Sequence, residues 1–223
     1  SHQSRLAALS PDNRPPQLNY PAVVAAMEQQ EPFWPPGKAH GYHPRTFGFL
    51  LDEIVRRSAL KPLGKLWNES LAPALKVDFR IGDLSSEHFD RLATMIPPRV
   101  QRPTEEEKPF FKAITQPDSI AAGAFASPGG MRSLSDIKQG EYLQAGLPSL
   151  GGVGSASGLA KFYQILAQGG YLDGVMVLPK PVVEAARTLQ HSGLDDTLAL
   201  ETAFTCGMMR DPLRPDGGKH RTM

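Results

Sequence analysis

Apolar residues recur at helical spacing most clearly in the stretch that follows residue 45. Five of them have the spacing i, i+3, i+4, i+7 and i+8, which places them on one face of a helix: Phe47, Leu50, Leu51, Ile54 and Val55. Thr46 is the expected N-cap, because its hydroxyl can accept a hydrogen bond from the first turn. The pattern predicts a helix that buries these five side chains.

A second apolar stripe begins after Pro62, a residue that suits the first position of a helix. Its members again share one helix face: Leu63, Leu66, Trp67 and Leu71. The two helices are predicted to form a helical hairpin.

Proline and glycine, 21 of each, divide the rest of the chain into short elements. Residues 13–37 hold six prolines and should form a surface loop around a short helix at 22–29. Apolar and charged residues alternate over 75–82, which predicts a half-buried strand or an extended arm. Helices are expected over 87–95 and from about residue 106.

A glycine-rich turn at 151–154 is expected to lead into a helix that ends at Gly169 or Gly170. Its apolar face holds Leu159, Phe162, Tyr163 and Leu166. Residues 172–179 then read as a tight turn and a short strand, and 181–189 as a further helix.

The composition is that of a globular protein: 40% of the 223 residues are apolar and 21% are charged. A formal net charge of +1 argues against a nucleic-acid partner. The sequence contains no apolar run of the roughly 18 residues that a membrane span needs. Cys206, the single cysteine, excludes an internal disulfide and is expected to be a buried structural thiol. Neither compartment nor oligomeric state follows from these features.

Three candidate sites are better explained as residues without a catalytic or binding role. His40 and His43, with His2 and His88 elsewhere, lack the spacing and carboxylate partners of a zinc site, and loop histidines are expected. Ser58 and Lys61 have Ser-x-x-Lys spacing, but they follow an amphipathic helix and precede a proline, so the match is read as coincidence.

The third is the group of glycines at 151, 152 and 154, which could cradle a phosphate but lacks the lysine of a Walker loop.

The fourth candidate is Tyr42, which lies in a loop just before the strongest helix. A tyrosine held in such a loop can act as a base or proton relay if a nearby cation lowers its pKa.

Around Tyr42 the sequence resembles the serine β-lactamase family, which includes class C β-lactamases, penicillin-binding D,D-peptidases and related carboxylesterases. The residues that match its second motif are Trp34, Pro36, Gly37, Gly41, Tyr42, Arg56 and Arg57. Three further blocks are similar in the family's order. SHQSRLAAL matches the end of LLxHxSGL, with Arg5 in place of the usual glycine, and ALKVDFRIG and LPSLGGVGSASGLAKFYQILAQGG match the other two.

The resemblance implies an α+β fold of the β-lactamase/D,D-peptidase type, of which this chain supplies mainly the helical domain and few strands. We expect residues 1–223 to be one β-lactamase-related domain, incomplete at both ends. The family's Ser-x-x-Lys nucleophile would precede this chain. Its Lys-Thr-Gly or His-x-Gly motif would follow, because GGKHRT near residue 220 has the wrong spacing.

By the same resemblance, Tyr42 is the catalytic residue of this chain, a proton relay between the serine, the lysine and the leaving group. His43 and Pro44 follow it, so the asparagine of a Tyr-x-Asn motif is absent, which weakens a β-lactamase and leaves an esterase or peptidase. The intact protein is expected to cleave a small ester or amide through an acyl-serine, without metal or organic cofactor. This isolated chain is expected to be inactive. The alternative is a non-catalytic pseudoenzyme that binds peptides or a protein partner through the former cleft.

Overall fold

The structure is a computed structural model and describes residues 2–94, 96, 102–131, 136 and 140–212. Helices predominate, and the strands pair in small antiparallel sheets, so the fold is α+β and mainly helical, as expected. The elements in chain order are α1 (Tyr20–Gln29), α2 (Thr46–Ala59), α3 (Leu63–Leu66), the π-helix η1 (Trp67–Leu71), α4 (Ala72–Leu75), β1 (Phe79–Ile81), α5 (Ser86–Asp90), α6 (Lys108–Thr115), α7 (Ile120–Ala126), α8 (Gly140–Gln144), β2 (Gly152–Gly154), α9 (Ala156–Ala167), β3 (Tyr171–Leu172), β4 (Val175–Met176), α10 (Lys180–Arg187), β5 (His191–Leu194), β6 (Glu201–Phe204) and β7 (Met209–Arg210).

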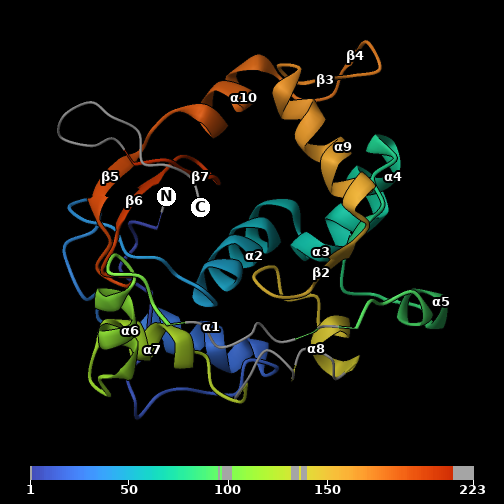
Figure 1. Ribbon diagram of the computed structural model, residues 1–223. Helices are drawn as coiled ribbons and strands as arrows, with labels where there is room; N and C mark the ends of the chain where they lie inside the picture. The colour runs from blue at the N-terminus through green and yellow to red at the C-terminus, as the bar shows by residue number, and fades with distance from the viewer. Residues whose placement is uncertain (1, 95, 97–101, 132–135, 137–139, 213–223) are drawn as a thin grey trace.

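The helix predicted after residue 45 is α2, which lies near the centre of the molecule (Figure 1). Its N-cap is Arg45, so the prediction for Thr46 was wrong. Thr46 is the first helical residue, and its hydroxyl donates a hydrogen bond to the Leu6 carbonyl over 2.7 Å. The threonine therefore ties α2 to the N-terminal segment and does not cap the helix.

The buried face of α2 differs in part from the predicted stripe. Phe49 is buried in a core shared with α1, whereas Leu51 and Ile54 are 37% and 64% exposed. The reason is that neighbouring segments contact the face that carries Gly48, Phe49 and Asp52, all of which are buried. Ile54 instead lines a shallow apolar pocket of about 250 Å³ beside α1.

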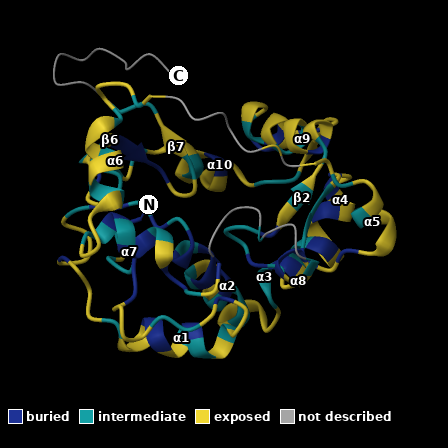
Figure 2. Cartoon of the chain, turned by 60° about the horizontal axis from the view of Figure 1, so that its bottom comes forward, coloured by how far each residue is buried: buried dark blue, intermediate teal, exposed yellow. Residues whose placement is uncertain are grey.

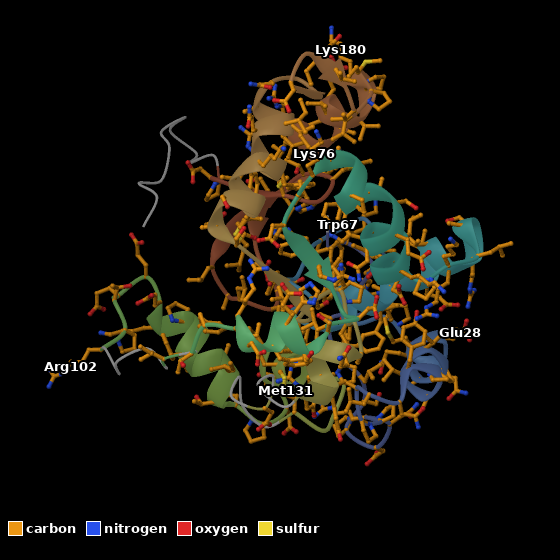
Figure 3. All side chains as sticks on the ribbon, turned by 90° about the vertical axis from the view of Figure 1, so that its right-hand side faces the viewer. Glu28, Trp67, Lys76, Arg102, Met131 and Lys180 are labelled. Carbon is orange, nitrogen blue, oxygen red and sulfur yellow. The ribbon has the colours of Figure 1, made fainter. Side chains whose placement is uncertain are left out.

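The second predicted helix runs without a break through α3, η1 and α4. Pro62 is its N-cap and lies one position earlier than predicted. Trp67, labelled in Figure 3, donates its indole N–H to the Phe79 carbonyl over 2.8 Å. The helix is thereby fixed against β1, and α2 and α3 pack as the expected hairpin.

The glycines at 151–154 were predicted to form a turn, but Gly152–Gly154 is strand β2, which pairs antiparallel with β1. A Cβ at Gly152 or Gly154 would lie 2.6 Å from the Phe79 ring. Glycine at these positions allows the backbone of β2 to cover that ring. The predicted helix follows as α9, capped by the Ser155 hydroxyl.

The remaining predicted elements agree in type and differ in length. The helix expected over 87–95 is α5 and ends at Asp90, and α6 begins at Lys108. Figure 2 shows that α5, α6 and α9 carry many exposed residues. Gly169 and Gly170, both with positive φ, end α9 as expected, and a β3–β4 hairpin and α10 follow.

The sheet β5–β6–β7 lies beside the N-terminal segment, on the opposite side of α2 from α9 (Figure 1). Arg5, in that segment, has a φ of 70°, a conformation that glycine adopts freely. This explains why a glycine suits the position in the LLxHxSGL block. The Arg5 guanidinium lies 5.7 Å from the centre of the Trp34 ring, a cation–π contact that offsets part of the strain.

Candidate active site

Tyr42 lies in the loop before α2, and its backbone is held by a residue far along the chain. The Tyr42 N–H donates to both carboxylate oxygens of Asp195, over 3.0 Å to Oδ1 and 3.1 Å to Oδ2. Asp195 follows β5 and is fully buried. The loop that carries Tyr42 is therefore attached to the three-stranded sheet.

The same carboxylate organises the connection between β5 and β6. Its Oδ1 accepts the backbone N–H groups of Thr197 and Leu198 over 2.9 and 2.8 Å, and its Oδ2 accepts the Thr202 hydroxyl over 3.1 Å. That hydroxyl in turn accepts a hydrogen bond from His40 Nε2 over 2.7 Å. Burial lowers the pKa of His40, so it is a neutral ring with its proton on Nε2.

The side chain of Tyr42 packs among other rings. It is stacked with Phe204 of β6, with ring centres 6.4 Å apart and planes at 7°, and its ring centre is 5.1 Å from that of His2. His2 Nδ1 accepts the backbone N–H of His43 over 3.1 Å. Both the backbone and the ring of Tyr42 are thus fixed by groups on separate segments.

His43 is buried next to Tyr42 and has a defined tautomer. Its Nδ1 donates to the Gly41 carbonyl, so its Nε2 accepts the Ser4 hydroxyl over 2.8 Å. Burial is the main cause that lowers the pKa of His43 to about 4 and that of His2 to about 3. Both rings are neutral at pH 7.

A pocket of about 400 Å³ opens beside Tyr42, within the size range of small-molecule sites. Its walls come from the N-terminal segment, the Tyr42 loop, α2, the segment before β2, and β6, β7 and the turn between them: His2, Tyr42, His43, Pro44, Phe47, Ser149, Phe204, Thr205, Gly207, Met208 and Met209. None of these lining residues is Asp, Glu, Lys or Arg. The pocket suits an uncharged, partly apolar group.

Close packing fixes the chain on the N-terminal side of Tyr42. A Cβ at Gly41 would lie 2.7 Å from Thr197 Oγ1 and 2.8 Å from the Trp34 ring. Only glycine fits there without moving Thr197, which belongs to the segment that Asp195 organises. The Trp-Pro-Gly and Gly-Tyr parts of the matched motif therefore meet in space.

The other sequence candidates do not join this pocket. The Ser58 hydroxyl donates to the Ile54 and Val55 carbonyls at the exposed end of α2, and Lys61 pairs with Glu69 over 3.1 Å, so their spacing is a coincidence as expected. Cys206 is exposed, which corrects its expected burial: it lies in the turn that ends β6, outside the core.

The histidines at 40 and 43 are loop residues as expected, but both are buried. Within the described part of the chain, no group of three or more His, Cys, Asp or Glu side chains could hold a metal ion. In the same residues, no helix is long and apolar enough to cross a membrane. The GGKHRT segment lies outside the described residues.

Sequence reasoning missed Asp195, Thr202 and Phe204. They are separated from Tyr42 by about 150 positions or more, as the Tyr42–Asp195 separation of 153 illustrates. No local spacing marks them, and only the two aspartates in a short polar stretch, Asp195 and Asp196, hinted at a turn.

Comparison with known proteins decides the family. The sequence model described as Beta-lactamase matches residues 1–222. The chain belongs to the β-lactamase family. The resemblance found around Tyr42 is thereby confirmed, and it extends over essentially the whole chain.

The chain is similar to three known proteins with different names. The chain is 29% identical over 210 residues to the esterase/β-lactamase LipL of Mycobacterium tuberculosis, covering 87% of this chain and 45% of LipL. It matches a penicillin-binding protein homologue from Caulobacter crescentus with 29% identity and a TM-score of 0.75, covering 94% of this chain and 53% of that one. A family VIII carboxylesterase matches with 25% identity and a TM-score of 0.74, with coverage of 94% and 53%. The chain therefore spans about half the length of each of these three proteins.

Proposed function

We propose that the intact protein is a serine hydrolase that cleaves a small ester or amide through an acyl-serine intermediate, with Tyr42 as its proton relay. The observation that supports this most is the placement of Tyr42. Its backbone is anchored to buried Asp195, its ring is stacked on Phe204, and it forms part of the wall of the 400 Å³ pocket.

In this reaction the serine oxygen attacks the carbonyl carbon of the substrate while its proton is removed, and the leaving alcohol or amine receives a proton as its bond to carbon breaks. Water then attacks the acyl-serine and releases the acid. A phenol hydroxyl at fixed distance from these atoms can pass the proton in both steps. A fixed Tyr42 suits such a relay, because proton transfer depends steeply on geometry.

An ester fits this site better than a β-lactam. Pro44 occupies the position two residues after Tyr42 and lines the pocket, so no side-chain amide is offered there. By its title the family VIII relative is a carboxylesterase, whereas the name of LipL gives both an esterase and a β-lactamase.

Tyr42→Phe tests the role of the tyrosine in the natural protein that contains this chain. With p-nitrophenyl butyrate, kcat should fall by about 10²–10⁴-fold, the usual contribution of a general acid–base group. Tyr163→Phe is the matched control, since Tyr163 is 50% exposed on α9 and away from the pocket. Equal rates for Tyr42→Phe and wild type would remove Tyr42 from the mechanism.

The nucleophile is tested separately by labelling with a fluorophosphonate probe and locating the modified serine by mass spectrometry. Ser58→Ala should leave labelling and turnover unchanged, because the Ser58 hydroxyl is bonded to its own helix. If neither p-nitrophenyl butyrate nor a chromogenic cephalosporin is turned over and no serine is labelled, the hydrolase proposal fails. A non-catalytic protein that binds peptides in this pocket would then be the better description.

A further inference from the structure

We infer that Asp195 is a positioning residue for Tyr42: its carboxylate sets where the tyrosine stands relative to the reacting atoms. This inference rests on the proposed function, since it concerns the same site. It goes beyond the family motif, because Asp195 lies 153 residues from Tyr42 and in none of the matched blocks.

The contact is direct and partly buried. Asp195 has no exposed surface, and both of its oxygens lie within 3.1 Å of the Tyr42 nitrogen. A hydrogen bond from a backbone N–H to an ionised carboxylate is stronger than one between neutral groups. The bond holds the peptide unit of Tyr42, so it acts on the position of the whole residue.

Asp195 also fixes the surface on which the Tyr42 ring rests. By accepting the Thr202 hydroxyl, it anchors β6, and β6 carries Phe204, whose ring stacks with Tyr42. One carboxylate therefore holds the backbone of Tyr42 and the strand that supports its ring. Loss of this carboxylate would loosen both.

Both side-chain oxygens of Asp195 must accept hydrogen bonds in this arrangement. The backbone N–H groups of Thr197 and Leu198 donate to Oδ1, and the Thr202 hydroxyl donates to Oδ2. In Asp195→Asn the amide NH₂ at one of these positions would face a donor. If the NH₂ group replaces Oδ2, the Thr202 hydroxyl must turn and donate to His40 Nε2. The proton of His40 must then move to Nδ1, a buried atom that has no hydrogen-bond partner in the described structure.

Asp195 does not line the pocket, so its loss should affect chemistry more than substrate binding. A displacement of about 1 Å at a catalytic group can lower the rate by about 10²-fold. We therefore expect kcat for p-nitrophenyl butyrate to fall by about 10²-fold in Asp195→Asn, with KM within about 2-fold of wild type.

The matched control is Asp196→Asn, the same chemical change at the adjacent position. Asp196 is exposed, and its own contact with the Tyr42 loop is a backbone bond from its N–H to the His40 carbonyl over 3.0 Å. This variant should keep the wild-type kcat. A similar fall in both variants would mean that any change of charge in this turn lowers activity, and it would overturn the inference.

A double-mutant cycle separates positioning from general destabilisation. In a Tyr42→Phe background, Asp195→Asn should lower kcat by less than about 3-fold further, because the residue it positions no longer transfers protons. A full additional 10²-fold loss would show that Asp195 acts independently of Tyr42 and would contradict the inference. If Asp195→Asn does not fold, Thr202→Val, which removes one of the anchored donors, takes its place in the same cycle.

A spectroscopic measurement distinguishes failure of this inference from failure of the proposed function. With tyrosine labelled at Cζ with ¹³C, the Tyr42 resonance is assigned by its loss in Tyr42→Phe. It should shift or broaden in Asp195→Asn and not in Asp196→Asn. If Tyr42→Phe leaves kcat unchanged, the proposed function fails whatever this signal does. If Tyr42→Phe lowers kcat while Asp195→Asn changes neither kcat nor the Tyr42 signal, the inference alone is wrong.

Discussion

Gly48 donates its backbone N–H to the Ser149 hydroxyl oxygen over 2.6 Å, and Ser149 in turn donates to the Arg45 carbonyl over 2.8 Å. These two bonds join the first turn of α2 to the segment before β2, which lies about 100 residues later in the chain. The backbone of α2 can approach Ser149 this closely because Gly48 has no side chain.

Gly48→Ala should destabilise the protein although alanine favours helices. The added Cβ would lie 2.5 Å from Ser149 N and closer still to its Oγ, and the backbone atom cannot turn away. Overpacking of this kind costs about 1–3 kcal/mol, which equals or exceeds the roughly 1 kcal/mol that alanine gains over glycine within a helix. A clash with a backbone atom should lie toward the upper end of that range. Urea unfolding followed by circular dichroism measures the change.

Gly140→Ala is the control for that substitution. Gly140 begins α8, and a Cβ there would meet only the Phe89 ring at 3.6 Å, an ordinary contact. Its free energy of unfolding should stay within about 1 kcal/mol of wild type. If Gly48→Ala were as stable as Gly140→Ala, the close contact with Ser149 would not hold in solution.

Stability should fall in mild acid because of His43 and His2. Their pKa values in the folded protein, about 4 and about 3, lie below the ordinary 6.5. At a pH between 4 and 6.5 the two histidines are therefore protonated in the unfolded chain and neutral in the folded one. Stability therefore falls as the pH drops through 6.5 toward 4. Between pH 7 and 5 each histidine should contribute a loss of about 2 kcal/mol, measured by urea unfolding at both pH values.

The variant His43→Asn isolates one of these contributions. It removes a ring that titrates only in the unfolded chain over this range, so the fall in stability between pH 7 and 5 should shrink by about 2 kcal/mol. The variant will also be less stable at pH 7, because it loses the bond to Ser4. An unchanged difference between the two pH values would rule out His43 as a source of the acid sensitivity.

Asp52→Ala should destabilise the α2–α3 hairpin. Asp52 is 2% exposed, and its two oxygens accept from the Arg56 Nε and the Leu63 backbone N–H, each over 2.6 Å. Leu63 begins α3, so the carboxylate also satisfies the start of that helix. Loss of both bonds should cost about 2 kcal/mol, measured by thermal or urea unfolding.

Asp83→Asn provides the comparison for Asp52→Ala. The Asp83 side chain is 88% exposed and pairs with Arg80 over 3.3 Å. Exposed pairs contribute little, and asparagine tolerates the positive φ of this residue, so a change within about 0.5 kcal/mol is expected. An equal loss in both variants would show that burial does not distinguish the two carboxylates.

Local patterns in the sequence predicted most of the helices. The stripes after residue 45, after Pro62 and after Ser155 became α2, the α3–η1–α4 helix and α9, because an amphipathic face and its end signals act within a few turns. Sequence patterns were less successful where the structure of a segment depends on a distant segment. The glycines at 152 and 154 were predicted to form a turn, but they form strand β2, which pairs with β1 and covers the Phe79 ring.

The sequence by itself determined the family, the mainly helical fold and the place of Tyr42, because motif order and helical periodicity are properties of neighbouring residues. The tertiary structure alone decided what holds Tyr42. Asp195, Phe204 and His2 reach it from segments whose positions become adjacent only when β5, β6 and the N-terminal segment pack together. A carboxylate that accepts a backbone N–H cannot be recognised from the residue type of its partner, since every residue except proline has that N–H to donate.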